Sequence, residues 1–177
     1  MIDLYTWHTP NGRKVSIMLE EIGMDYNVHS INIAKDEQFQ PHFLEVSPNN
    51  RIPAIVDKDN NNYSLFESGA ILMYLAEKSG KLINKSNSDE YFRTIEWLMW
   101  QMGGVGPMFG QVHHFVKYNK GKSAYAEERY SKEARRLYGV MDKRLGQHQY
   151  ISGNEYSIAD ISIWPWTARF DWQEIDL

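Results

Sequence analysis

The order of strand and helix patterns in the first 80 residues is the feature that most restricts the fold of this chain. Residues 2–5 and 26–33 alternate between apolar and polar side chains, as half-buried strands do, and residues 15–22 between them carry apolar side chains at helical spacing. A strand, a helix and a second strand in this order predict a parallel strand pair with a right-handed crossover.

The same stretch continues with a short helix and a hairpin. The helix is expected near residues 39–44, the third strand over residues 52–57 and the fourth over residues 63–66. Three asparagines at residues 60–62 supply the turn between the last two strands, and a helix with an apolar face opens at residues 67–68. The predicted order is therefore β-α-β-α-β-β-α.

Beyond residue 88 the pattern is helical throughout. Apolar residues recur at helical spacing over residues 90–115 and 124–145, and Ser157 and Asp160 have the spacing of a capping box. A polar stretch rich in Ser, Asn and Gly precedes this part of the chain. We therefore expect two domains, residues 1–80 and 89–177, joined by a linker at residues 81–88.

Composition excludes several classes of protein. The chain has 177 residues, a formal charge of −4 and 42% hydrophobic residues, which fits a globular protein and offers no basic surface for nucleic acid. The most apolar run, residues 69–76, is far shorter than the ~20 residues that span a bilayer, so no membrane partner is expected. There is no cysteine, which fits a cytoplasmic location, and no secretory signal is visible.

Two segments could form a site for a small peptide. A cis bond between Ile52 and Pro53 would turn the backbone groups of Ile52 outward, where they could pair with an extended ligand. Glu67 and Ser68 stand at a helix start, where free amides and the helix dipole favour a carboxylate; Glu67 could pair with an amine, and Arg51 with a second carboxylate. Alternatively, Pro53 is an ordinary proline at the edge of a strand, and Ser68 is an ordinary helix N-cap.

Together these motifs resemble the glutathione transferase family. Two motifs occur in the same order as in that family: Glu-Ser-Gly-Ala-Ile at residues 67–71 and Tyr-Ser-Ile-Ala-Asp-Ile at residues 156–161. Residues 9–12, 45–53 and 97–115 are similar to its nu-class branch of glutathione-dependent disulfide-bond oxidoreductases. The resemblance implies an α/β thioredoxin-like N-terminal domain and an all-α C-terminal domain. Compared with members of that family the chain is short, because they usually continue past the capping-box helix.

The catalytic thiol in this interpretation belongs to glutathione, since the chain has none. Only a thiolate attacks a disulfide, and donors aimed at the sulfur lower the thiol pKa from its free value of about 8.5. Thr9 can offer its hydroxyl, and Asn11 an amide at the start of a helix; the resemblance implies the same two positions. Tyr5 is a competing donor, although its place within a strand favours a structural role.

The resemblance also implies roles for further residues. It implies that Gln38 and Arg51 hold the glycine end of glutathione, with Arg where most members have Lys. It also implies that Arg129 binds a second glutathione or the partner subunit's ligand, although Arg129 could instead be a solvated helix charge. Members are usually homodimers. His113 and His114 diverge on a helix and suit pocket lining better than a metal pair, so no metal site is predicted.

The predicted function is glutathione-dependent reduction of small disulfides. One alternative is a transferase that conjugates glutathione to electrophiles. The other is a non-catalytic glutathione-binding regulator, whose marker would be loss of the glutathione-binding residues or an added polar extension.

Overall fold

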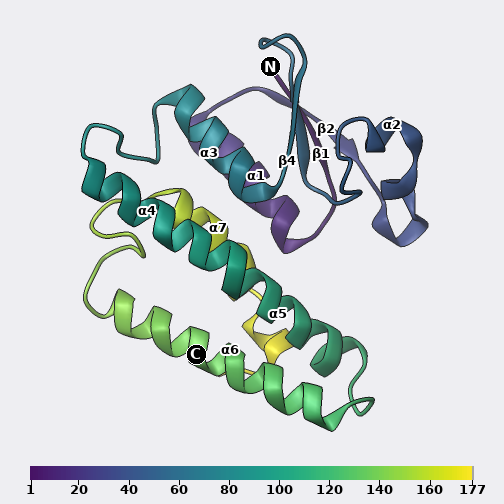
Figure 1. The fold of residues 1–177 in the computed structure, drawn as a ribbon, viewed down its shortest axis with the longest axis vertical. Helices are drawn as coiled ribbons and strands as arrows, with labels where there is room; N and C mark the ends of the chain where they lie inside the picture. The colour runs from purple at the N-terminus through teal and green to yellow at the C-terminus, as the bar shows by residue number, and fades with distance from the viewer. Residues whose placement is uncertain (177) are drawn as a thin grey trace. The chain divides into compact units, whose positions relative to one another are not determined.

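The protein is described here by a computed structural model in which residues 1–176 are placed. The chain folds as two compact units, Met1–Lys81 and a second unit that begins at Leu82. Figure 1 shows strands only in the first unit, and the second as helices.

The first unit is built on a four-stranded sheet with the order β2-β1-β3-β4. The strands are β1 (Ile2–Thr6), β2 (Tyr26–Ser30), β3 (Ala54–Asp57) and β4 (Tyr63–Phe66). β1 and β2 are parallel, while β3 runs antiparallel to both β1 and β4. The predicted parallel pair and hairpin are both confirmed.

The predicted second strand was three residues too long. β2 ends at Ser30 because Asn32 caps a 3-10 turn over Ile33–Lys35, accepting a hydrogen bond from the Ala34 N–H at 3.0 Å. A second 3-10 turn over Glu37–Phe39 and the short helix α2 (Pro41–Leu44) follow. The asparagine side chain therefore outcompetes the strand pattern at this point.

Helices α1 (Pro10–Ile22) and α3 (Ser68–Ser79) pack against each other (Figure 1). Their apolar positions are fully buried, which removes both apolar faces from water. These buried residues are Val15, Met18, Leu19, Ile71, Leu72 and Leu75.

Strand register brings the predicted site segments to one edge of the sheet. Ala54, the first residue of β3, pairs with Tyr5 near the end of β1 and with Phe66 at the end of β4. The loop after β1, the residues just before β3 and the start of α3 therefore meet at this edge. The end of β2 lies there too, because Ser30 pairs with Thr6.

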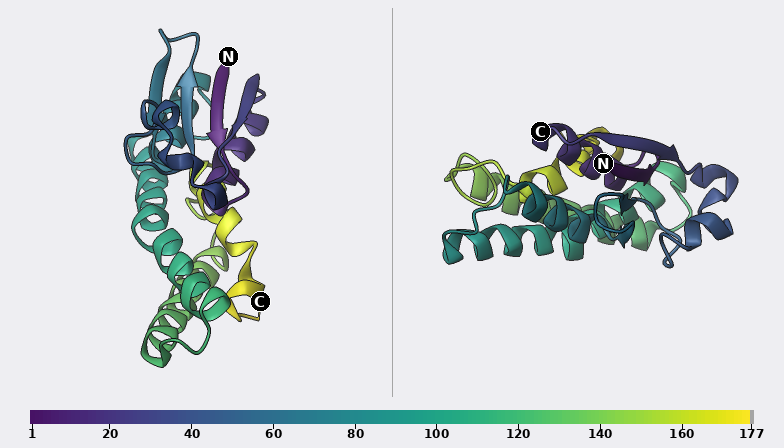
Figure 2. Two further views of the ribbon diagram at one scale, coloured as in Figure 1. Left: turned by 90° about the vertical axis from the view of Figure 1, so that its right-hand side faces the viewer. Right: turned by 90° about the horizontal axis from the view of Figure 1, so that it is seen from above.

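The second unit is helical, and residues 88–118 form one continuous helical run (Figure 2). The helix expected over residues 90–115 lies within this run. π-helical turns at Gln101–Val105 and His113–Tyr118 separate α4 (Ser88–Trp100) from α5 (Gly106–Val112) and end the run. Gly110 lies beside the ring of Trp166, where an added Cβ would be 3.4 Å from Trp166 Cη2, an ordinary van der Waals distance.

The run packs against α6 (Ala124–Leu145) and α7 (Ile158–Thr167), which a 3-10 turn over Phe170–Gln173 follows. The predicted capping box at α7 is confirmed: Ser157 caps the helix, and the Asp160 carboxylate accepts from the Ser157 N–H at 3.0 Å. Among the placed residues, no helix has the length and apolar character needed to cross a membrane.

Candidate active site

The loop after β1 ends in a capped helix. Thr9 is the N-cap of α1, and its hydroxyl oxygen accepts a hydrogen bond from the Gly12 N–H at 3.1 Å. The oxygen is used as an acceptor, so the hydroxyl hydrogen can still be donated to another group. Asn11, the second residue of α1, adds its backbone N–H at the positive end of the helix. Both residues are partly exposed.

Gly12 lets this loop fold tightly. A Cβ at Gly12 would lie 2.4 Å from the Trp7 carbonyl oxygen and 2.4 Å from Thr6 Oγ1, closer than side-chain atoms approach one another. A glycine is therefore required for the loop to hold Thr9 and Asn11 beside the end of β1.

Tyr5, the competing donor, packs elsewhere. Its ring stacks on His29 at 4.6 Å between centroids and contacts the buried cluster of Ile31, Phe43 and Ala54. These contacts agree with the structural role that its position in the strand favoured.

The segment before β3 has the predicted backbone geometry. The bond between Ile52 and Pro53 is cis, and Ile52 lies outside the strand ladder, which starts at Ala54. The preceding loop is fixed by Ser47, which is fully buried and donates to the Arg51 carbonyl oxygen at 2.8 Å. The Arg51 side chain is exposed and contacts Asn50.

Gln38 is buried at the same edge. Its Nε2 donates to Asp36 Oδ1 at 3.4 Å, whereas its Oε1 is buried with no hydrogen-bond partner among the placed residues. A buried acceptor without a partner is destabilising unless a ligand supplies a donor. Gln38 therefore has the character of a binding residue.

The start of α3 combines an exposed acid with a buried hydroxyl. Glu67 is exposed, has a left-handed φ of 71° and lies within reach of Asn49, whose Nδ2 is 3.5 Å from Glu67 Oε1. Ser68, the first residue of α3, is buried. Its Oγ lies 3.3 Å from Nζ of Lys14, a residue that was not among the predicted site residues.

A signal for Lys14 was present in the sequence. It stands beside Val15 and at helical spacing from Met18, on the face of α1 that carries apolar residues. A lysine on a buried helix face is expected to have a polar partner. The local pattern cannot identify Ser68 as that partner, because Ser68 lies 54 residues away in the sequence.

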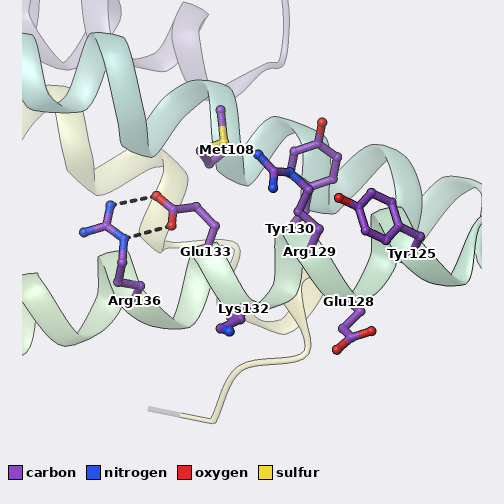
Figure 3. Close-up of a pocket in the computed structure, with 8 residues that line it drawn as sticks. All are labelled: Met108, Tyr125, Glu128, Arg129, Tyr130, Lys132, Glu133 and Arg136. Carbon is purple, nitrogen blue, oxygen red and sulfur yellow. Dashed lines mark hydrogen bonds and ion pairs between the residues drawn. The ribbon is translucent and has the colours of Figure 1, made fainter.

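Arg129 belongs to the second unit. It is exposed on α6 and lines a cavity of about 670 Å³ together with Met108 of α5 and other residues of α6 (Figure 3). Arg136 pairs with Glu133 in this cavity through two hydrogen bonds, at 2.7 and 2.8 Å. The Arg136 hydrogen bonds, and to a lesser degree the charge of Arg129, hold the pKa of Glu133 below its usual value. The seven other predicted site residues all belong to the first unit.

Comparison with known proteins places the chain in a family. Residues 1–77 match the N-terminal domain of glutathione S-transferases, and residues 124–171 match their C-terminal domain. Disulfide-bond oxidoreductase YfcG of Escherichia coli (strain K12) is 49% identical over 181 residues, a match that covers 100% of this chain and 84% of YfcG. The chain belongs to the glutathione S-transferase superfamily. The predicted family and fold class are therefore confirmed.

Other glutathione S-transferase relatives agree. Disulfide-bond oxidoreductase YghU of the same organism is 43% identical over 172 residues, which cover 93% of this chain and 59% of YghU. A solved glutathione transferase family member from Pseudomonas fluorescens pf-5, with two glutathione bound, has 51% identity and a TM-score of 0.90 over 95% of this chain and 76% of its own.

A Pseudomonas putida glutathione transferase, with one glutathione disulfide bound per subunit, has 48% identity and a TM-score of 0.89, covering 95% of this chain and 74% of its own. The predicted kinship with glutathione-dependent disulfide oxidoreductases is confirmed by the names of these relatives.

Proposed function

We propose that this chain is a glutathione-dependent reductase of small disulfides. The observation that carries the proposal is the capped start of α1, where Thr9 and Asn11 stand at the sheet edge in a chain without cysteine. Thioredoxin-like enzymes that form mixed disulfides with their own thiol need a cysteine in this loop, so here the attacking sulfur belongs to bound glutathione.

The reaction is a pair of thiol–disulfide exchanges. The glutathione thiolate attacks one sulfur of the substrate disulfide, the S–S bond breaks, and the first substrate thiolate leaves and takes up a proton. A second glutathione thiolate attacks the glutathione sulfur of the mixed disulfide and releases the second substrate thiol. The substrate is reduced by two electrons, and two glutathione molecules become one glutathione disulfide.

Thr9 and Asn11 stabilise the thiolate in this proposal. The Thr9 hydroxyl and an Asn11 amide hydrogen donate to the sulfur, and the N-terminal end of α1 favours negative charge there. Each donor lowers the thiol pKa because it stabilises the charged form alone.

The remaining site residues hold the peptide. The backbone of Ile52 pairs with the ligand's central residue, Glu67 takes the γ-glutamyl amine, and Ser68 takes the α-carboxylate. Gln38 and Arg51 hold the glycine end, where the unpartnered Gln38 Oε1 would accept the glycyl N–H. In the second unit, Arg129 binds a second glutathione. We also propose a cytoplasmic homodimer.

Two assays distinguish this function from its alternatives. Reduction of a hydroxyalkyl disulfide and conjugation of an aromatic chloride are measured in parallel with glutathione, and glutathione binding is measured by calorimetry. We expect turnover in the first assay to exceed that in the second. Conjugation alone would identify a transferase, and binding without either activity would identify a regulator.

A further inference from the structure

The sequence contains one Asn-Gly pair, at Asn11 and Gly12. In such a pair the backbone nitrogen of the glycine can attack the side-chain amide of the asparagine, because glycine has no side chain that hinders the approach. Every other asparagine of the chain is followed by a larger residue. The pair therefore marks Asn11, a candidate catalytic residue, as the asparagine most susceptible to this reaction.

The fold does not allow a larger residue at Gly12. Gly12 is buried, and an added Cβ would lie 2.4 Å from the Trp7 carbonyl oxygen and 2.4 Å from Thr6 Oγ1. A side chain that blocked the attack would therefore clash with the loop after β1. Because the labile pair is required by the loop, its protection has to come from the conformation of the backbone.

The cap of α1 supplies this protection. The Gly12 N–H donates to Thr9 Oγ1 at 3.1 Å, so the nitrogen that would attack is held in a hydrogen bond. Asn11 is also the second residue of α1, and a helical backbone has to unwind before the five-membered ring can close. The reaction therefore starts from an opened first turn, in which the contacts that Asn11 makes in the folded protein are broken.

We infer that Asn11 is a site of spontaneous deamidation, whose rate is set by opening of the first turn of α1 and is held down by the Thr9 cap. In the opened turn the Gly12 nitrogen bonds to Asn11 Cγ, the Cγ–Nδ2 bond breaks, and ammonia leaves with the amide proton of Gly12. Water then opens the succinimide ring. Cleavage at Cγ gives aspartate, and cleavage at the backbone carbonyl carbon of Asn11 gives isoaspartate.

Both products carry a carboxylate where Asn11 carries an amide. In the proposed function the Asn11 amide donates to the glutathione sulfur, whereas a carboxylate cannot donate and repels a thiolate. Deamidation would therefore lower turnover, and the site would lose activity as the protein ages. This loss of activity rests on the proposed function, but the modification itself does not.

The test follows deamidation of the full chain in neutral buffer over several weeks. Trypsin cleaves after Arg13 and releases residues 1–13, in which Asn11 is the only asparagine, so mass spectrometry of this peptide measures Asn11 alone. We expect Thr9→Ala to deamidate about fivefold faster than wild type, because loss of a helix cap increases the opened population by about this factor. Wild type unfolded in urea should deamidate about tenfold faster than folded wild type, or more.

Two variants are matched controls. Thr9→Ser keeps the cap and should deamidate within about twofold of wild type. Ser157→Ala removes a helix cap from the second unit and should leave the rate at Asn11 unchanged. Equal rates in Thr9→Ala and Thr9→Ser, or in folded and unfolded wild type, would overturn the protection by the cap.

Asn11→Asp, which carries one of the products from the start, separates the modification from the proposed function. We expect its kcat for disulfide reduction to be lower than that of wild type by about tenfold or more. If Asn11→Asp keeps the turnover of wild type while Thr9→Ala still deamidates faster, the catalytic role of Asn11 is wrong and the modification site stands.

Discussion

Among residues 1–176, each unit buries one basic side chain, and the two side chains differ in what surrounds them. Lys14 in the first unit lies beside Ser68 and in the field of Glu67 at a helix start. His113 in the second unit lies between aromatic rings, 5.6 Å from Trp166 and 5.4 Å from Trp172 between centroids.

His113 is held by a structural network. Gln173 donates from Nε2 to His113 Nε2 at 3.1 Å and to the Trp166 carbonyl oxygen at 3.0 Å, and its Oε1 accepts from the Tyr138 hydroxyl at 2.7 Å. Burial, with a smaller contribution from Arg169, lowers the pKa of His113 to about 4, so the ring is neutral at pH 7. These hydrogen bonds around His113 are therefore all made within the second unit.

The largest expected contrast is in turnover. Replacing both Thr9 and Asn11 with Ala should lower kcat for disulfide reduction by about 100-fold or more, because the side-chain donors of both residues are lost and only the backbone N–H of residue 11 remains. His113→Gln should stay within about threefold of wild type, since Gln can keep a hydrogen bond to Gln173. Steady-state kinetics at saturating glutathione measures both.

Thr9→Ser is the control for the first variant. It keeps both the helix cap and the hydroxyl, so it should retain most of the activity. Full activity in the double alanine variant would contradict the assigned roles.

Gly12→Ala should destabilise the first unit by about 3 kcal/mol, the upper part of the range for overpacking, because the new Cβ meets the backbone oxygen of Trp7. Gly103→Ala in the second unit is the comparison, since nothing lies within 4 Å of its Cβ position. Urea unfolding followed by circular dichroism measures both. Similar free energies for the two variants would show that the loop after β1 can relax.

The free energy of unfolding should depend on pH in two separate ranges, one set by His113 and the other by Lys14. The folded pKa of His113 is about 4 against an ordinary 6.5, so the unfolded state binds more protons between these values and stability falls as pH drops through them. For Lys14 the window runs from about 7 to 10.5, because burial lowers its folded pKa to about 7, and stability rises with pH across it. Each slope is at most about 1.4 kcal/mol per pH unit.

Thermal unfolding from pH 4 to 10 measures these slopes. His113→Gln should flatten the acid window alone, and Lys14→Met the alkaline window alone. An unchanged alkaline slope in Lys14→Met, or an unchanged acid slope in His113→Gln, would contradict the assignment of that window.

The smallest expected effect is at the capping box of α7. Ser157→Ala should destabilise the second unit by about 1 kcal/mol through loss of the cap. Ser16→Ala, which removes a hydroxyl from α1 that donates to the Arg13 carbonyl, should change stability by less than about 0.5 kcal/mol. Equal losses of stability in Ser157→Ala and Ser16→Ala would contradict a stabilising role of the capping box.

Local sequence patterns predicted most of the fold. Alternation identified the strands, and Ser157 with Asp160 identified the start of α7. The pattern failed at Asn32, where a side chain caps a turn, and at the π-helical turns, which change the helical repeat without a change in apolar spacing.

Local sequence patterns also predicted part of the candidate site. Glu67, Ser68 and the cis bond after Ile52 are recognisable because each is marked within a few residues of sequence. Lys14 was missed because its partner Ser68 is brought to it by packing of α1 on α3. Asn49 was missed likewise, as it approaches Glu67 from a different loop.

The register at Ala54 has a practical consequence for engineering. Ala54 pairs with Tyr5 and Phe66 at the site edge, whereas Asp57 pairs with Ile2 and Tyr63 at the opposite end of the same short strand. A reporter peptide inserted between Asn61 and Asn62, in the exposed hairpin tip, would leave the site-edge pairing in place. One residue inserted before Ala54 would instead displace Ile52 and Arg51, so this strand separates a tolerant end of the molecule from an intolerant one.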